Sequence, residues 1–189
     1  MEFEGDRRGF FRRLFGDAVQ HVARATEERV VQHRYVRPPG ALPEMAFLAA
    51  CTRCSECVRA CPAGAILTVS SRGGLAAGTP YLEPSRIPCL ACADMPCATA
   101  CPTAALTLPP DGWRTERLGR VEFDPHRCIT FEGKPCGVCV GACPVGEAAL
   151  SLDADGHPVL KAEGCVACGA CVRECITIPS SFTFHPVDR

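Results

Sequence analysis

Apolar and polar positions follow a helical period only near the start of the chain. Between about residues 10 and 31 one face is apolar, and the opposite face carries Arg13, Asp17, Gln20 and Arg24. The apolar positions are Phe11, Leu14, Phe15, Ala18, Val22 and Ala25. This spacing predicts an amphipathic helix that ends before Pro38-Pro39. We expect the helix either to pack on the rest of the protein or to dock on a partner protein or a membrane surface.

Beyond residue 44 the apolar runs are short and recur after Cys-Pro pairs, at 62–67, 102–108 and 144–152. Each run predicts a short helix opened by proline, whose missing N–H costs nothing at the first helical position, and then a short strand. Turns are expected at Pro110-Asp111-Gly112 and Asp155-Gly156. A second strand should follow in each repeat, within 79–84, 120–125 and 158–161. Trp113, beside the first turn, is expected to pack on a hairpin.

All sixteen cysteines fall into four quartets. The quartets are Cys51-Cys54-Cys57-Cys61, Cys89-Cys92-Cys97-Cys101, Cys128-Cys136-Cys139-Cys143 and Cys165-Cys168-Cys171-Cys175. The first and fourth have the spacing C-x2-C-x2-C-x3-C, and the first three end in Cys-Pro. Their starts are 38, 39 and 37 residues apart, a period that indicates a repeated structural unit.

This spacing is the ligand run of bacterial-type iron–sulfur ferredoxins. Three thiolates of a tight loop can wrap one face of a cubane, and the fourth cysteine is expected to reach a different cluster. The quartets therefore predict four [4Fe–4S] clusters with all sixteen cysteines as ligands. Two alternatives are a disulfide scaffold and zinc sites. The chain is longer than usual disulfide-stapled modules, and zinc sites usually pair two separated C-x2-C knuckles rather than crowding each loop.

The charge and hydrophobicity of the chain limit the kinds of partner that it could bind. The net charge is −1, with 20 Lys and Arg against 21 Asp and Glu, so nothing indicates a nucleic-acid partner. The longest apolar stretch, 45–51, is far too short to span a membrane. Membrane association is therefore expected only through a partner or the N-terminal helix. Few aromatics and many glycines and prolines predict a thin core, so bound clusters should supply much of the folding free energy.

Arg7-Arg8 resembles the twin-arginine export motif. Export requires an apolar segment after the arginines, but Asp17, Gln20 and Arg24 fall in that region. We therefore expect a cytoplasmic protein, with export to the periplasm through this motif as the alternative.

The irregular loops resemble those of the NapG/MauM group of polyferredoxins over roughly residues 78–180. The segment from Thr79-Pro80-Tyr81 to Cys97 is similar to that group's second loop, with its C-x2-C-x4-C spacing. Cys128 stands eight positions before Cys136, as in its third loop, and Ile176 replaces proline after the last cysteine. Residues 37–54 look more like the cytoplasmic NapF ferredoxins, which also begin with an arginine pair.

The resemblance implies an α+β fold of two bacterial-type 2[4Fe–4S] ferredoxin-like modules, preceded by the amphipathic helix and a linker over 1–44. In related four-cluster subunits the modules are nested, with an inner module here at about 80–150 and an outer one formed by 45–79 and 151–189. Nesting implies four ligand sets. They are Cys51, Cys54, Cys57 and Cys175; Cys61, Cys165, Cys168 and Cys171; Cys89, Cys92, Cys97 and Cys143; and Cys101, Cys128, Cys136 and Cys139. In the sequential alternative Cys61 would lie beside Cys89 and Cys92.

These features predict an electron-transfer protein without a substrate site of its own. Four clusters in series favour a wiring subunit that connects the catalytic subunit of a redox enzyme to a quinol- or cytochrome-linked donor, over a freestanding ferredoxin. NapG and MauM relatives serve periplasmic nitrate reduction and methylamine oxidation. An alternative from another class is a maturation factor that binds a partner redox enzyme and assists cofactor loading.

Overall fold

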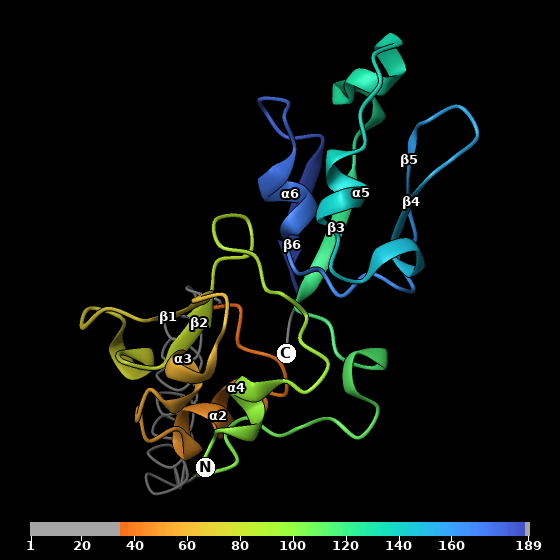
Figure 1. Cartoon of the computed structure of the whole chain (residues 1–189). Coiled ribbons are helices and arrows are strands. Elements are labelled where there is room, and N and C mark those ends of the chain that lie inside the picture. The colour runs from red at the N-terminus through yellow and green to blue at the C-terminus, as the bar shows by residue number, and fades with distance from the viewer. Residues whose placement is uncertain (1–34, 188–189) are drawn as a thin grey trace, which may run out of the picture. The chain divides into compact units, whose positions relative to one another are not determined.

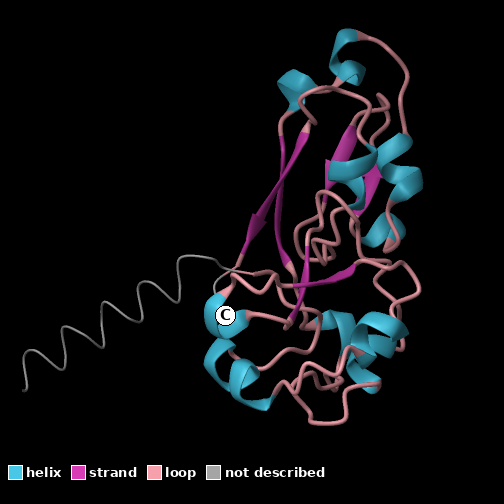
Figure 2. Cartoon of the chain, turned by 90° about the vertical axis from the view of Figure 1, so that its left-hand side faces the viewer, coloured by secondary structure: helices cyan, strands magenta, loops and turns pink. Residues whose placement is uncertain are grey.

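The computed structural model describes residues 35–187. The predicted helix at about residues 10–31 and the Arg7-Arg8 motif lie outside the described residues, so the docking role of that helix and the cytoplasmic location stay predictions. Within residues 35–187 the chain forms short helices and three two-stranded sheets joined by long loops. Figure 2 shows how small these elements are beside the loops that connect them.

The elements are labelled in Figure 1. The helices are α2 (Glu44–Ala50), α3 (Glu56–Ala60), α4 (Pro96–Thr99), α5 (Val138–Ala142) and α6 (Ala170–Glu174). The strands are β1 (Ile66–Thr68), β2 (Pro80–Leu82), β3 (Gly119–Phe123), β4 (Leu150–Leu152), β5 (Pro158–Leu160) and β6 (Phe182–Pro186). Short 3-10 helices are η1 (Gly74–Ala76), η2 (Gly112–Arg114), η3 (Pro125–Arg127), η4 (Ile129–Glu132) and η5 (Gly146–Ala148).

The first module, residues 35–118, is built on the antiparallel β1–β2 hairpin, in which Ile66 lies opposite Leu82. Two isolated bridges close it, from Val36 to Leu82 and from Ala41 to Leu106. Its core includes Phe47, Ile66, Leu82, Met95 and Leu106, and several cysteines pack against the same cluster. The cysteine loops are therefore part of the hydrophobic core.

The second module, residues 119–187, repeats this hairpin and adds a longer pair of strands. Strand β4 pairs antiparallel with β5, and β3 pairs antiparallel with β6 from Gly119↔Pro186 to Phe123↔Phe182. Val121, Leu150 and Phe182 form its core together with Cys139 and Cys171. The predicted β1–β2 and β4–β5 hairpins are confirmed.

The hairpin predicted between 102–108 and 120–125 does not form. Leu106 pairs with Ala41, whereas β3 pairs with β6, about sixty residues later in the chain. Pro109 and Pro110 follow directly after Leu108 and have no N–H to continue a ladder, so the strand cannot extend toward the turn. Residues after Leu108 instead lead from the first module into the second.

The short helices also lie elsewhere than predicted. They run between the third and fourth cysteines of each quartet, and the residues after Pro62 and Pro102 form turns. Proline disfavours the helical conformation for the residue before it, and Cys61 and Cys143 accordingly have extended ψ angles of 111° and 114°. Cys-Pro thus ends an α-helix in these repeats. The prediction that it opens a helix is wrong for Pro62 and Pro102, whereas after Pro144 the short 3-10 helix η5 follows from Gly146.

The folded body begins earlier than the predicted boundary at residue 45. Arg37, only 4% exposed, donates to Glu44 Oε1 and Oε2 at 2.5 and 2.9 Å, to Thr79 Oγ1 at 2.9 Å and to the Pro80 carbonyl at 2.7 Å. Its guanidinium also lies 4.7 Å from the centre of the Phe47 ring. This buried side chain ties the segment before α2 to β2, so residues 35–44 belong to the first module.

We predict that Arg37→Ala destabilises the first module by about 2–3 kcal/mol, because the buried Thr79 hydroxyl and the Pro80 carbonyl lose their donor. The fall in urea midpoint of anaerobically purified protein measures the effect. The matched control is Arg59→Ala, which removes an exposed pair with Glu56 and should cost at most about 1 kcal/mol. Equal midpoints for the two variants would show that Arg37 does not anchor this segment.

Candidate iron–sulfur sites

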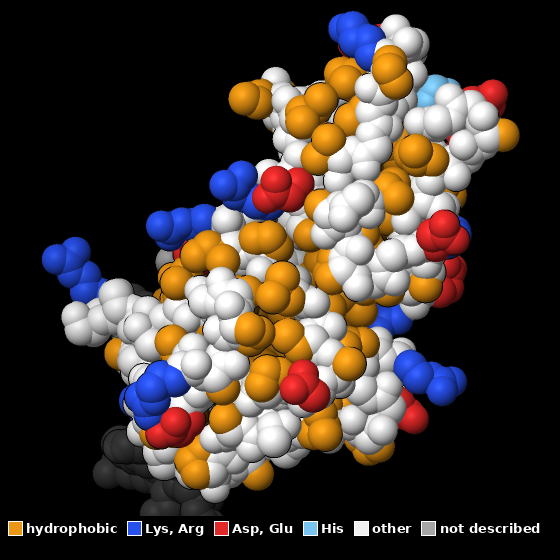
Figure 3. All heavy atoms as spheres, viewed as in Figure 1, with side chains coloured by type: hydrophobic (Ala, Val, Ile, Leu, Met, Phe, Trp, Pro, Cys, Tyr) orange, Lys and Arg blue, Asp and Glu red, His pale blue; other side chains and the backbone are white. Residues whose placement is uncertain are grey.

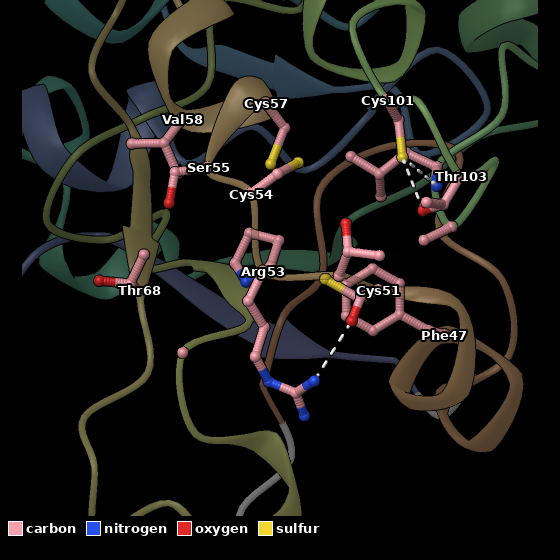
Figure 4. Close-up of a pocket in the computed structure, with 15 residues that line it drawn as sticks. Phe47, Cys51, Arg53, Cys54, Ser55, Cys57, Val58, Thr68, Cys101 and Thr103 are labelled. Carbon is pink, nitrogen blue, oxygen red and sulfur yellow. Dashed lines mark hydrogen bonds between the residues drawn. The ribbon is translucent and has the colours of Figure 1, made fainter.

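The structure gathers the cysteines around four hollows, each next to one cysteine loop. The loops, numbered 1 to 4, span 51–57, 89–97, 128–139 and 165–171. Around loop 1, Cys51, Cys54 and Cys57 face Cys101, the last cysteine of the second quartet, across one hollow (Figure 4). We call these four residues site 1. The Arg53 side chain braces loop 1 by donating to the carbonyls of Leu75, Ala77 and Cys51 at 3.0, 2.8 and 3.3 Å.

The other hollows have the same composition, three cysteines of one loop and one from the neighbouring quartet. Site 2 consists of Cys61, Cys89, Cys92 and Cys97; site 3 of Cys128, Cys136, Cys139 and Cys175; and site 4 of Cys143, Cys165, Cys168 and Cys171. The four hollows have similar volumes of about 310 to 370 Å³, which include some space open to solvent. None of the sixteen cysteines forms a disulfide.

This arrangement corrects the nested pairing. Cys61 lies with Cys89 and Cys92, and Cys101 lies with loop 1, so the first two quartets exchange their fourth cysteines. The third and fourth quartets do the same through Cys143 and Cys175. Pairing is therefore sequential, and the inner and outer modules expected at 80–150 and at 45–79 with 151–189 are wrong.

The hairpins explain why neighbouring loops pair. The chain leaves site 2 at Cys61, turns back through β1–β2 and returns to loop 2 beside it; β4–β5 does the same between Cys143 and loop 4. A hairpin closes a short stretch of chain, whereas nesting would bring loops 1 and 4 together across more than a hundred residues. The entropic cost of closing a loop grows with its length, so local pairing is favoured.

The cysteine loops contain a repeated left-handed conformation. Positive φ angles occur just before the second cysteine at Arg53, Ala91 and Ala167, and just before the helix at Ser55, Met95 and Gly169. Five of these six residues are not glycine, and non-glycine residues adopt such angles uncommonly. Strained conformations of this kind tend to cluster at functional sites. In loop 3, Pro135 precedes Cys136 and cannot adopt a positive φ. There the left-handed residue is Gly133, at the end of η4.

Burial raises the pKa of half of the cysteines. It raises the pKa of Cys57, Cys89, Cys139 and Cys168 to about 11 and that of Cys97 to about 12. Neighbouring cysteines of the same site add to this rise, as Cys61 does for Cys89. These thiols are therefore neutral without a metal, and a metal that binds them must displace their protons.

Cys175 departs from this pattern. Burial alone would raise its pKa, but hydrogen bonds from Thr177 and Ser181 outweigh burial and lower the pKa to about 7. Thr177 Oγ1 lies 3.2 Å from Cys175 Sγ, and the Ser181 N–H donates to the same sulfur at 3.4 Å. Thr130 Oγ1 likewise lies 3.2 Å from Cys128 Sγ. Site 3 therefore has hydroxyl groups beside two of its sulfurs.

Backbone donors to sulfur recur at the other sites. The N–H groups of Ala91 and Ala167 donate to Cys89 and Cys165, and the N–H of Leu106 donates to Cys101, each at 3.4 Å. Such bonds stabilise thiolates and tune iron–sulfur centres. The threonines of site 3 were not among the predicted site residues. The repeated Cys-x-Thr pattern at Thr103, Thr130 and Thr177 is the sequence signal that indicates them.

The donor set fits a cluster better than a single ion. Four sulfurs bound to one zinc would lie about 3.8 Å apart, because Zn–S bonds are about 2.3 Å long. Within residues 35–187 no three His, Cys, Asp or Glu side chains are placed to hold one metal ion. Four cysteines spread around a hollow match a cubane, in which each thiolate binds a different iron.

Comparison with known proteins agrees with this geometry. Models of the 4Fe-4S dicluster domain match residues 50–105, 88–147 and 120–176. The first and last of these segments each contain one exchanging pair of loops, and the middle one spans loops 2 and 3. MauM of Paracoccus denitrificans, a methylamine utilization ferredoxin-type protein, is 40% identical over 166 residues, which cover 84% of this chain and 74% of MauM. The chain belongs to the MauM/NapG family of ferredoxin-type proteins.

Other members of the family show the same extent of similarity. NapG of Escherichia coli is 36% identical over 168 residues, 83% of this chain and 70% of NapG. MauM of Methylophilus methylotrophus is 34% identical over 181 residues, covering 92% and 78%. The predicted NapG/MauM resemblance is thus confirmed, and the sixteen cysteines of this family member fit four [4Fe–4S] clusters. The likeness to NapF of Escherichia coli is weaker, at 29% over 143 residues, covering 74% and 79%.

No helix in the described part of this MauM/NapG family member is both long and apolar enough to cross a membrane.

Trp113 does not pack on a hairpin as predicted. It lies in η2, donates from Nε1 to the Cys92 carbonyl at 2.8 Å, and packs with residues of loops 2 and 4.

We predict that Cys61→Ala and Cys92→Ala remove the same cluster. Each single variant, and also the double variant, should lose about four irons, whereas Cys61→Ala combined with Cys54→Ala should lose about eight. Iron and sulfide analysis of anaerobic protein measures the losses. A loss of about eight irons in the Cys61/Cys92 double variant would contradict sequential pairing.

We also predict that Thr177→Val lowers the reduction potential of one cluster by about 40 mV. The hydroxyl bond to sulfur should stabilise the reduced form, with its extra negative charge, by about 1 kcal/mol more than the oxidised form. Redox titration followed by EPR measures the shift. The control is Thr99→Val, whose hydroxyl donates to the Met95 and Asp94 carbonyls rather than to sulfur, and which should leave the potentials unchanged.

Proposed function

We propose that this protein relays single electrons through four [4Fe–4S] clusters, one at each of sites 1 to 4, with all sixteen cysteines as ligands. The observation that carries the proposal is the shared composition of the four hollows, each with three cysteines of one loop and the fourth cysteine of the neighbouring quartet. A bound [4Fe–4S] cluster supplies one-electron chemistry that side chains alone lack.

The residues around the sites suit this role. One or two cysteines of every site are buried, including Cys57, Cys97, Cys139 and Cys171, and this shields their sulfurs from water. Backbone N–H groups and threonine hydroxyls donate to other sulfurs and so set how readily each site takes up negative charge. On this proposal the protein has no substrate site of its own.

We propose further that the protein is a wiring subunit of a larger oxidoreductase. Its partners would be a catalytic subunit and a quinol- or cytochrome-linked donor. Four sites in one chain support this role, since a diffusing carrier needs only one or two. Similarity to methylamine utilization ferredoxin-type proteins supports this role.

The surface supports contact with other proteins. Figure 3 shows apolar side chains spread over the viewed face, with most charged ones toward its edges. Large apolar residues that are exposed include Met45, Leu75, Leu90, Leu108, Phe131, Val138, Ile176 and Ile178. Val138 and Ile176 also line the hollow of site 3. Exposed apolar groups beside a redox site are typical of surfaces that meet a partner.

Metal analysis tests the cluster proposal. Anaerobically purified protein should be brown and hold about sixteen irons and about sixteen acid-labile sulfides. Cys136→Ser should affect the cluster of site 3 and leave most of the iron in place. Finding zinc in place of iron would contradict the proposal.

Copurification tests the wiring role, because a wiring subunit stays with its active enzyme, whereas a maturation factor leaves it.

A further inference from the structure

The two modules meet through loops 2 and 4. The N–H of Cys89, the first cysteine of loop 2, donates to the carbonyl of Cys168, the second cysteine of loop 4, at 2.9 Å. Next to it, the N–H of Leu118 donates to the carbonyl of Val166 at 3.1 Å. Two cysteines of different modules are therefore linked by a single hydrogen bond.

Side chains fill the same junction. Val166, Cys168 and Ala170 form a buried cluster against which Cys89 and Trp113 pack. Trp113 Nε1 donates to the Cys92 carbonyl at 2.8 Å, so the ring is fixed to loop 2 while it contacts loop 4.

The Arg117 guanidinium links the two modules. It donates to the Trp113 carbonyl at 2.6 Å and to the Glu163 carbonyl, two residues before loop 4, at 2.5 Å.

Gly169 shows how closely the modules approach. It follows Cys168 with a φ of +88°, and a Cβ added there would lie 2.1 Å from the carbonyl oxygen of Pro84 in the first module. Only glycine fits this point without pushing the two backbones apart. The contact belongs to the same loop that receives the hydrogen bond from Cys89.

We infer that loops 2 and 4 form the electronic junction between the modules, so that the sites work in the spatial order 1, 2, 4, 3. Electron tunnelling weakens steeply with distance, so the linked pair Cys89 and Cys168 gives the favoured crossing. With clusters held by the cysteines of sites 2 and 4, one electron would pass between them in either direction, so that one site is oxidised and the other reduced by one electron with no proton or bond exchanged. One-electron redox proteins supply and remove the electron at the two ends.

This order differs from the order of the quartets along the chain. The third quartet comes before the fourth in sequence, yet site 3 stands at an end and site 4 in the middle. The inference rests on the proposed function, because it requires clusters at sites 2 and 4. Beyond that function, it identifies sites 2 and 4 as the pair that couples the two modules.

The test uses full-length double variants that keep one cluster in each module. Cys54→Ala with Cys139→Ala leaves sites 2 and 4; Cys92→Ala with Cys139→Ala leaves sites 1 and 4. Both should retain about eight irons. After full reduction, EPR should show spin–spin splitting in the first variant and two uncoupled signals in the second.

The outcomes separate the inference from the proposed function. If the wild-type protein binds no iron and sulfide, the proposed function fails. Two results would overturn the inference alone, provided that the variants bind iron. One is the absence of splitting in the variant that keeps sites 2 and 4. The other is equal splitting in the variant that keeps sites 1 and 4.

If the double variants lose their remaining clusters, a second comparison tests the inference. Gly169→Ala should weaken the inter-module coupling of the four-cluster protein while most of its iron is retained. The control Gly156→Ala lies outside the cysteine loops and carries a similar backbone cost at φ +81°. A Cβ added there meets nothing within 4 Å, so this variant should leave the EPR spectrum unchanged. Unchanged coupling in Gly169→Ala would overturn the inference.

Discussion

Each cysteine loop supplies three thiols to its own site and depends on its partner loop for the fourth. This exchange means that neither site of a module is complete until both loops and the hairpin between them are in place. The apolar cores are small, and cysteines are among their buried members, such as Cys57, Cys97, Cys139 and Cys171. The same residues therefore hold the fold together and form the sites. In such small domains metal binding and folding are one equilibrium.

Much of this organisation follows from the sequence. The quartets, their period, and the β1–β2 and β4–β5 hairpins depend on residues close together in the chain, and local patterns predict them well. The pairing of β3 with β6 joins segments about sixty residues apart, and no local signal indicates it. Strand β3 has the same alternation whether it pairs with residues near Leu106 or with β6. Its partner is decided by tertiary packing around Val121 and Phe182.

The loop pairing could not be derived from spacing, because spacing within a quartet does not say where its fourth cysteine goes. The x4 spacing of loop 2, which led to the nested expectation, has a local explanation. Its extra residues place Met95, 1% exposed, in the core of the first module, and Pro96 opens α4. The long spacing in loop 3 similarly places Phe131 on the His157 ring, with centroids 4.0 Å apart. Both irregular loops serve packing, and packing is compatible with either pairing.

The two modules also become complete at different times during synthesis. The first module is complete once the chain reaches Leu118, which is buried in its core, so all the residues it needs have been made at that point. The second module needs Cys175 for site 3 and β6 as the partner of β3, and both come at its end, after loop 4. Because domains generally fold as they emerge, sites 1 and 2 can accept metal while β3 still lacks a partner. The edge of β3 stays open through the synthesis of two cysteine loops, and in that interval the nascent chain is most exposed to mispairing.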